Sequence, residues 1–262
     1  MLDFHTHTFF SNDSRSDPAA MIDAARRRGV RYLAFTDHAD FAPTDFRIDP
    51  DAYFEQLGQW RGMHDGVEVF VGIEIGWQIS HTLEVRSFLE RIRRHACDVV
   101  IASFHRSAGL DIGDGTYMRG KTLHDWWRGL LEEMLSAVQA EPDFDILGHL
   151  DMMRRYPPAK GSRIPEDLYG MLDRLLGWLA EHDKTLECNS SGFRYGLDGP
   201  HPEEWVFKRF RELGGRRVSL GSDAHVPDDV GYWTTEARKM LQRCGFSDVC
   251  GFRARVPFLI PL

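Results

Sequence analysis

The chain begins with a His-x-His pair, His5 and His7, at the end of a short apolar segment. In an extended strand, residues i and i+2 point to the same side, so both imidazoles can face one point. Two converging imidazoles are a common half of a metal site. By itself the pair could also be a chance arrangement near a chain end. Whether the pair binds a metal ion depends on which other residues the rest of the chain brings beside it.

The rest of the chain alternates predicted strands with predicted helices. Six strands are expected after the first one, at 31–36, 68–73, 98–103, 144–147, 185–188 and 217–220. Helices are expected at 18–28, 52–64, 83–95, 123–140, 165–182, 202–213 and 235–243. Such alternation predicts an α/β fold with a parallel sheet and right-handed crossovers.

The polar residues at the strand ends discriminate between two ways of arranging this sheet. Every predicted strand ends in His, Asp, Glu or Asn at its carboxyl edge. An open doubly wound sheet gathers ligands at one switch point, whereas a barrel brings all carboxyl ends to one mouth. We therefore expect a TIM-like (β/α)7 barrel with seven strands. No linker divides the chain, so residues 1–262 are expected to form one domain, with loops 109–121 and 156–165 long enough to act as lids.

Nine potential metal ligands follow these strands or the first loop. They are His5, His7, Asp13, His38, Glu74, His105, His149, Asp223 and His225. One ion needs three or four protein ligands, so this set predicts two or three ions with a bridging carboxylate. Mixed imidazole and carboxylate ligands suit zinc, iron or manganese better than magnesium or calcium. Any one of these residues alone could instead be a buried, hydrogen-bonded side chain.

A site with several metal ions predicts phosphoester hydrolysis. Paired ions stabilise the attacking and leaving oxygens, and a metal-bridging hydroxide can serve as nucleophile. The sequence has no Gly-x-Ser-x-Gly, Walker or Gly-x-Gly-x-x-Gly motif. Glu74, Asp223 and His225 are the candidate catalytic residues, the last two as possible proton donors. Four arginines next to the site motifs could bind a phosphate: Arg106, Arg154, Arg155 and Arg194.

Net charge and cysteine usage limit the binding partners and the cellular compartment that we expect. The net charge of −8 (32 basic and 40 acidic residues) argues against nucleic acid or an anionic membrane as partner. A small phosphorylated metabolite needs only a local positive pocket. Four scattered cysteines without a C-x-x-C pair, no apolar run of about 18 residues and no signal-peptide pattern predict a cytoplasmic protein with reduced thiols. The oligomeric state stays open.

Six short motifs, taken together and in order, resemble those of the polymerase and histidinol phosphatase (PHP) superfamily. They are His5-Thr-His7, Thr36-Asp37-His38, Gly72-Ile-Glu74, Ser103-Phe-His105, Gly148-His149-Leu-Asp151 and Gly221-Ser-Asp223-Ala-His225. The resemblance covers essentially the whole chain and implies a distorted seven-stranded β/α barrel with a trinuclear metal centre. Segments 148–156 and 187–194 are most similar to monofunctional histidinol-phosphatases, enzymes of histidine biosynthesis.

The resemblance also implies a role for each ligand. One metal would be held by His5, His7, Glu74 and Asp223; a second by Glu74, His105 and His149; a third by Asp13, His38 and His225. The arginines in the two segments would clamp the substrate phosphate. The chain departs from the family pattern at Asp13, where some members have His, and at Arg106-Ser107, where an apolar pair is expected.

The resemblance implies that L-histidinol phosphate is the substrate and that histidinol and phosphate are the products. An acidic group should bind the substrate amine, and the candidates are Asp40, Asp45 and Asp151. Two alternatives remain at this point. One is a phosphoesterase for another small phosphomonoester, a nucleotide or a phosphodiester. The other is a non-catalytic or polymerase-associated module, which the charge of −8 disfavours.

Overall fold

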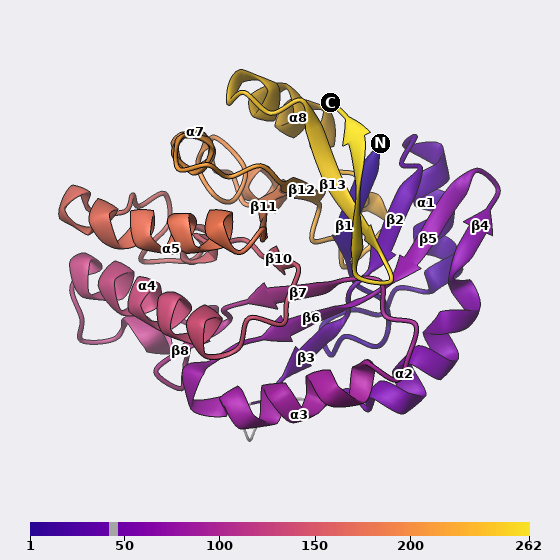
Figure 1. Ribbon diagram of the computed structural model, residues 1–262, viewed down its shortest axis with the longest axis horizontal. Helices are drawn as coiled ribbons and strands as arrows, with labels where there is room; N and C mark the ends of the chain where they lie inside the picture. The colour runs from indigo at the N-terminus through magenta and orange to yellow at the C-terminus, as the bar shows by residue number, and fades with distance from the viewer. Residues whose placement is uncertain (42–46) are drawn as a thin grey trace.

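The computed structural model describes residues 1–41 and 47–262, and its centre is built from short parallel strands. Helices lie around the outside of these strands, and the two chain ends lie near each other (Figure 1). One sheet has the order β1-β2-β5-β4, with β1 (Leu2–Thr6), β2 (Tyr32–Phe35), β5 (Val67–Val71) and β4 (Gly62–His64). A second sheet has the order β12-β11-β10-β7-β6-β3, with β12 (Val218–Gly221), β11 (Thr185–Asn189), β10 (Ile146–Leu147), β7 (Val100–Ser103), β6 (Ile73–Gly76) and β3 (His38–Asp40).

Two of the seven predicted strands are each divided between the two sheets. β2 pairs with β5 and β3 pairs with β6, all in parallel. Only Gly72 separates β5 from β6. A Cβ atom at Gly72 would lie 2.3 Å from the carbonyl oxygen of Val99, which directly precedes β7. Only glycine therefore allows the backbone at position 72 to lie this close to Val99. As a consequence Glu74 lies within a strand, β6, rather than after one.

The α/β class and the parallel pairing are confirmed, whereas a closed barrel is not. Among the described residues, the strand ladders form separate sheets. β1 meets the end of β12 through two backbone hydrogen bonds: Asp223 N donates to His5 O, and His7 N donates to Ala224 O, both at 2.8 Å. These bonds lie beyond the last residue of β12, so the two strands do not form a regular ladder.

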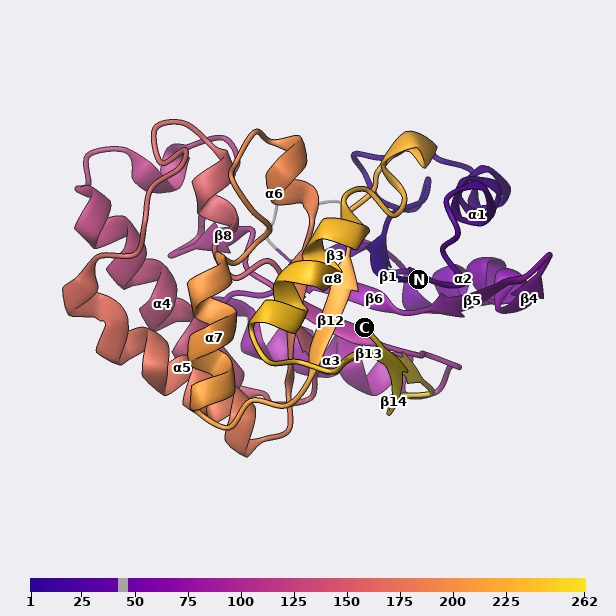
Figure 2. The same ribbon diagram turned by 90° about the horizontal axis from the view of Figure 1, so that it is seen from above.

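A helix lies at each predicted position, although some bounds differ and the short helix at 191–194 was not predicted, and the helices surround the strands in both views (Figures 1 and 2). They are α1 (Pro18–Arg27), α2 (Pro50–Leu57), α3 (Thr82–Ile92), α4 (Leu123–Ala140), α5 (Tyr169–Glu181), α6 (Ser191–Arg194), α7 (Glu204–Glu212) and α8 (Thr234–Arg243). Single 3-10 turns connect them: η1 (Gly58–Trp60), η2 (Ile79–His81), η3 (Thr116–Met118), η4 (Met152–Arg155), η5 (Glu166–Leu168) and η6 (Pro227–Asp229). No helix of the described part is long and apolar enough to cross a membrane.

The predicted helix at 52–64 is wrong in its second half. α2 ends at Leu57, and the chain then passes through η1 into the antiparallel strand β4. Asp65 and Gly66 both have positive φ angles, which suits the tight turn that pairs β4 with β5. His64 therefore lies in a strand and not at a helix end.

A carboxyl-terminal hairpin, β13 (Asp248–Arg253) and β14 (Val256–Pro261), was not predicted. Its turn reaches the amino-terminal ends of two central strands: Ala254 N donates to Asp98 Oδ1, and Arg255 pairs with Asp145. Asp98 lies two residues before β7, and Asp145 directly precedes β10. The hairpin thus covers the amino-terminal face of the sheet, which leaves the carboxyl-terminal face for a site.

Candidate metal centre

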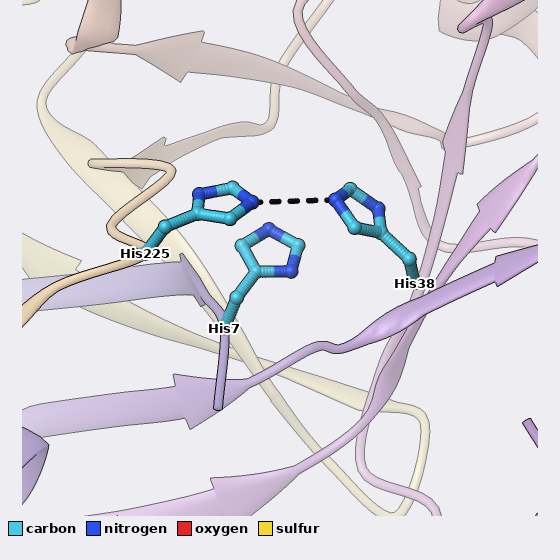
Figure 3. Close-up of side chains that lie close together, drawn as sticks. All are labelled: His7, His38 and His225. Atoms are coloured by element: carbon cyan, nitrogen blue, oxygen red, sulfur yellow. Dashed lines mark hydrogen bonds between the residues drawn. The ribbon is translucent and has the colours of Figure 1, made fainter. Parts of the chain in front are cut away.

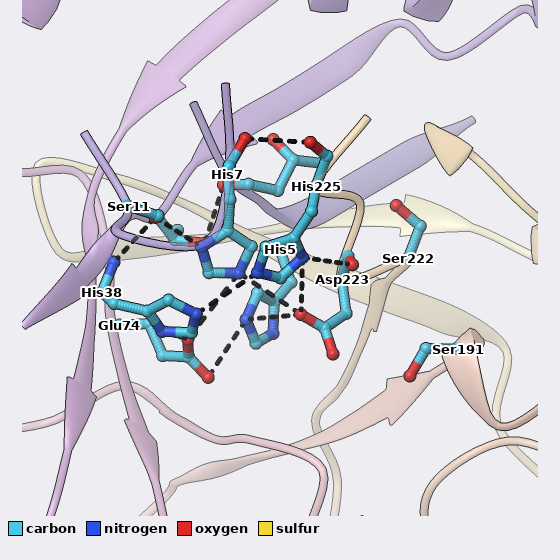
Figure 4. A network of polar contacts seen from close by, with 12 residues as sticks. His5, His7, Ser11, His38, Glu74, Ser191, Ser222, Asp223 and His225 are labelled. Atoms are coloured by element: carbon cyan, nitrogen blue, oxygen red, sulfur yellow. Dashed lines mark hydrogen bonds and ion pairs between the residues drawn. The ribbon is translucent and has the colours of Figure 1, made fainter. Parts of the chain in front are cut away.

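The nine predicted ligands lie together at the carboxyl-terminal face of the strands, and Glu74 contacts histidines from several of these strands. Figure 4 shows His5, His7, His38, Glu74, Asp223 and His225 close to one another. Glu74 Oε1 lies 2.9 Å from His149 Nε2, 3.2 Å from His5 Nε2 and 3.3 Å from His105 Nε2. Glu74 Oε2 lies 2.6 Å from His38 Nδ1. The Glu74 side chain is fully buried. Its two oxygens therefore face different histidines, the geometry that a bridging carboxylate needs.

Three imidazoles form the other half of the cluster (Figure 3). The ring of His7 lies between those of His38 and His225, with centroids 4.2 and 4.0 Å away, and His38 Nε2 lies 3.3 Å from His225 Nε2. Asp13 Oδ2 lies 3.2 Å from His225 Nε2 and 3.6 Å from His38 Nε2. Asp223 Oδ1 connects the two halves, at 3.3 Å from His7 Nε2.

The ligand atoms group into four sets of three whose members lie within 4.8 Å of one another. These sets are His5–His7–Glu74, Glu74–His105–His149, His7–His38–His225 and His38–Asp40–His105. The first two match two of the expected ligand sets. The third adds His7 to His38 and His225, and Asp13, expected with these two, also has its Oδ2 within 3.6 Å of both, although its side chain is 55% exposed. The fourth brings in Asp40, which was expected only as an amine-binding candidate.

Several buried atoms of the cluster lie close to an oppositely charged group but make no hydrogen bond of regular geometry. They include His5 Nε2, His7 Nε2 and Glu74 Oε2. Buried polar atoms in proteins are almost always hydrogen-bonded, so orphan atoms aimed at one point indicate a missing partner. A divalent cation can accept lone pairs from imidazole nitrogen and carboxylate oxygen together. The residues present therefore fit a site for transition-metal ions.

The charges of the cluster stabilise one another in the absence of metal. Burial opposes ionisation of Glu74, but His5, His38 and His105 outweigh it and hold the pKa of Glu74 well below its usual range. Burial likewise lowers the pKa of His105, yet Asp40 and Glu74 outweigh burial and raise that pKa to about 10. The carboxylates and imidazoles of the cluster thus favour each other's charged forms.

A second layer of side chains orients the candidate ligands, and sequence reasoning missed most of it. Glu187 Oε1 lies 2.6 Å from His5 Nδ1, Ser11 Oγ lies 3.0 Å from His7 Nδ1, and Asp40 Oδ1 lies 3.0 Å from His105 Nδ1. Such partners fix the direction of metal-binding imidazoles. The sequence did indicate a role for Glu187, because a carboxylate within the predicted buried strand 185–188 needs a buried partner.

A cavity of about 460 Å³ opens beside the cluster, and three of the four predicted arginines line it. Arg155 Nη1 donates to Asp223 Oδ2 at 2.8 Å. Arg194 donates to the carbonyl oxygens of Ser222 and Asp223 at 3.1 and 2.9 Å. Arg106 lies in the short hairpin of β8 (Arg106–Ser107) and β9 (Leu110–Asp111) and pairs with Asp111 at 3.4 Å.

Arg154 is not brought into this cavity. Its guanidinium donates to Asp151 Oδ2 and to the carbonyl oxygen of Ser162, and it lies 3.3 Å from Glu203. These partners hold Arg154, which is buried, at a separate cavity of about 620 Å³ on the other side of η4. Consecutive arginines thus face different cavities, and we leave Arg154 out of the phosphate site.

Of the three candidates for the acidic group that would bind the substrate amine, Asp40 and Asp151 lie at different places. Asp40 lines the cavity beside the cluster. Asp151 is buried and bound to His201 Nδ1 at 2.5 Å and to Arg154, so it does not face that cavity. Asp45 lies outside the described residues.

Histidines outside the set of nine candidate ligands have other partners. His95 Nε2 pairs with Asp51 at 2.7 Å, His124 pairs with Asp167 at 2.8 Å, and His182 Nδ1 lies 2.8 Å from the carbonyl oxygen of Trp178. His81 Nδ1 lies 3.0 Å from Ser80 Oγ on an exposed turn. His201 is fully buried, with its Nδ1 against Asp151.

Comparison with known proteins gives a family match and several relatives. The model of the PHP domain family matches residues 3–191, about 70% of the chain. The histidinol-phosphatase of Lactococcus lactis is 29% identical over 259 residues, which cover 96% of this chain and 94% of the relative. A Clostridium acetobutylicum protein named "Probable histidinol-phosphatase" is 27% identical, with 95% and 96% covered.

A solved structure agrees with these relatives. The crystal structure of histidinol phosphate phosphatase from Lactococcus lactis, complexed with zinc, L-histidinol and phosphate, superposes with a TM-score of 0.85. The two chains are 27% identical, and 98% of each is covered. The fold and the full length of this chain are therefore shared with a zinc-containing phosphatase.

Proposed function

Because this chain belongs to the PHP domain family, we propose that it is a metal-dependent phosphomonoesterase that hydrolyses L-histidinol phosphate to L-histidinol and phosphate. One observation carries the proposal. The buried Glu74, with histidines at both of its oxygens, lies beside a cavity into which Arg155 and Arg194 project. This arrangement supports neighbouring sites for cations and for a phosphate dianion. Relatives that cover nearly the whole chain are named for the same reaction.

We assign three ion sites to this cluster, to be filled by zinc, iron or manganese. His5, His7, Glu74 and Asp223 would hold the first; Glu74, His105 and His149 the second; Asp13, His38 and His225 the third. Bound ions would supply an activated water and positive charge for the phosphate oxygens. The orphan atoms His5 Nε2 and His7 Nε2 support this assignment, as does the zinc in the Lactococcus lactis structure.

The arginines would bind and orient the phosphate. Arg155 is only 9% exposed, and its pKa is raised far above the physiological range because Asp223 and the neighbouring tyrosines outweigh burial. Its guanidinium therefore carries a fixed charge and fixed N–H directions, which suit the oxygens of a phosphate dianion. Arg194 lies on the same wall, and Arg106 lines the same cavity.

Asp223 would not donate the proton to the leaving oxygen, and His225, assigned above to the third ion, could donate it only while its ring is not bound to that ion. Burial favours the neutral form of Asp223, but Arg155 and the neighbouring histidines outweigh burial and hold its pKa well below the usual range. An ionised carboxylate has no proton to donate near neutral pH. His225 is 25% exposed and lines the cavity. Asp40, on the same cavity, remains the candidate partner of the substrate ammonium group.

We also propose that the seven strands form a distorted barrel within one domain, residues 1–262. The backbone bonds between β1 and the end of β12 support closure on one side, and the β2–β5 and β3–β6 pairs support continuity on the other. Four free, buried cysteines support a cytoplasmic location.

A substrate panel tests the function. Protein reconstituted with zinc, manganese or iron is assayed for phosphate release from histidinol phosphate, a sugar phosphate, a nucleoside monophosphate and bis-p-nitrophenyl phosphate. We expect the highest kcat/KM for histidinol phosphate. A higher value for another substrate would overturn the substrate assignment, and no turnover with any metal would overturn the enzyme assignment.

A further inference from the structure

Three buried side chains connect the candidate metal ligands to the phosphate-binding arginine. They are Glu187 and Asn189 on β11 and Ser191 at the start of α6, and each is at most 1% exposed. None of them belongs to the predicted ligand set or to the arginines. They lie two residues apart in a single stretch of the chain.

In this series of side chains every hydrogen bond is donated in the same direction, from Arg155 toward Glu187. Arg155 Nη1 donates to Ser191 Oγ at 3.1 Å, and Ser191 Oγ donates to Asn189 Oδ1 at 2.6 Å. Asn189 Nδ2 then donates to Glu187 Oε2 at 3.2 Å. Because an arginine only donates and a carboxylate only accepts, both ends fix the orientation of the amide and the hydroxyl between them.

Each end of this series contacts a group of the metal centre. Glu187 Oε1 lies 2.6 Å from His5 Nδ1, and Glu187 Oε2 accepts a hydrogen bond from His149 N at 2.7 Å. At the other end Arg155 Nη1 donates to Asp223 Oδ2. The three side chains therefore connect His5 to Arg155 by an unbroken series of side-chain contacts.

We propose that Glu187, Asn189 and Ser191 form a positioning relay, which sets Arg155 in a fixed direction relative to the metal ligands. The proposal deepens the proposed function, because it assumes that Arg155 binds the substrate phosphate. The backbone of Asn189 already bonds to His201 through both its N–H and its carbonyl group. The amide side chain is thus not needed for the strand itself; Asn189 Oδ1 accepts from Ser191 N at 3.0 Å, which holds the turn into α6, as well as from Ser191 Oγ in the relay.

The relay predicts a different defect at each end. Ser191→Ala should weaken binding of inorganic phosphate to the zinc-loaded protein about tenfold, because Arg155 loses an acceptor, and should leave zinc affinity unchanged. Glu187→Ala should lower zinc affinity about 10- to 100-fold. Asn189→Ala should lower both. Ser219→Ala is the matched control, because the Ser219 hydroxyl is equally buried and has no hydrogen-bond partner.

Calorimetric titration with zinc, and then with inorganic phosphate, measures both affinities without turnover. The double variant Ser191→Ala/Asn189→Ala should bind phosphate no more weakly than Asn189→Ala alone, since both changes break the same series of contacts. Additive losses, or full phosphate affinity in Ser191→Ala, would overturn the relay. A parental protein that binds phosphate but does not hydrolyse histidinol phosphate would contradict only the proposed function.

One further variant guards against misfolding. Asn189→Asp keeps an acceptor for Ser191 but places a second carboxylate against Glu187 Oε2. We expect zinc affinity to fall while phosphate affinity stays higher than in Asn189→Ala. A purely structural role would lower the melting temperature and both affinities together in every variant, and that outcome would also contradict the relay.

Discussion

Asp223 presents its two oxygens to different partners: Oδ2 lies 2.8 Å from Arg155 Nη1, while Oδ1 lies 3.3 Å from His7 Nε2. One carboxylate thus contacts both a candidate metal ligand and the candidate phosphate-binding arginine. A phosphate that enters the cavity would meet Arg155 already oriented by Asp223, which reduces the entropy lost on binding.

Replacement of Arg155 by alanine should therefore impair substrate use more than folding. A charge-assisted hydrogen bond is worth about 1.5–3 kcal/mol, so kcat/KM for histidinol phosphate should fall roughly 10- to 100-fold, with a raised KM. Steady-state kinetics measures the effect. Arg163→Ala is the control, because the Arg163 side chain is 81% exposed and should leave both constants unchanged. An unchanged KM in Arg155→Ala would contradict its role.

Replacement of Arg154 by alanine should impair folding more than substrate use. The change leaves the buried Asp151 and the largely buried Glu203 without their shared cation, which should lower the free energy of unfolding by about 3–5 kcal/mol. Denaturant titration measures this loss. KM should stay within about twofold of the parental value at a temperature where the variant is folded. A raised KM without lost stability would return Arg154 to the phosphate site.

Replacement of Glu74 by glutamine should abolish most metal binding, although it preserves shape. The amide has one oxygen and no charge, so it cannot bridge two ions between His38 and His149. Metal analysis after dialysis should find at least one ion fewer per chain than in the parental protein. Zinc should also raise the melting temperature of the parental protein more than that of the variant. Equal metal content in both proteins would contradict the bridging role.

Acid should destabilise the turn of the carboxyl-terminal hairpin through Asp143. Burial raises the pKa of Asp143, but Arg255 and Arg93 outweigh burial and hold it below the usual range. Its stabilising contribution is therefore present above the unfolded-state pKa, about 3.9, and is lost as the pH falls through the lower folded-state value.

Thermal unfolding from pH 7 downward measures that contribution. The stability of Asp143→Asn should depend less on pH between about 5 and 2 than that of the parental protein. Asp145→Asn is not an equivalent variant, because burial outweighs Arg255 there and raises the pKa of Asp145. Identical pH profiles for the parental protein and Asp143→Asn would contradict this account.

Much of the fold was predictable because each strand signal is local. The apolar segments that precede His38, Glu74 and His105 predicted parallel strands, and parallel strands bring their carboxyl ends together whatever lies between them. The convergence of the polar residues at the strand ends followed from that rule, whereas the position of Asp13, on the first loop, did not.

The remainder depends on contacts between distant segments. Nothing local distinguishes Arg154 from Arg155, and only the positions of Asp151 and Glu203 decide which of them faces the site. The turn of the hairpin β13–β14 consists of Ala254 and Arg255, which adopt positive φ angles although neither is Asn or Gly, so the sequence carries no hairpin signal there. The turn is held by Asp98 and Asp145, which lie just before β7 and β10.

The most direct test is an anomalous diffraction map of crystals grown with zinc. We predict peaks on both sides of the Glu74 carboxylate, with ions about 2.0–2.2 Å from ligand atoms that include His5 Nε2 and His149 Nε2. A map without any ion next to Glu74, from crystals saturated with zinc, would contradict the assignment of this cluster as a metal centre.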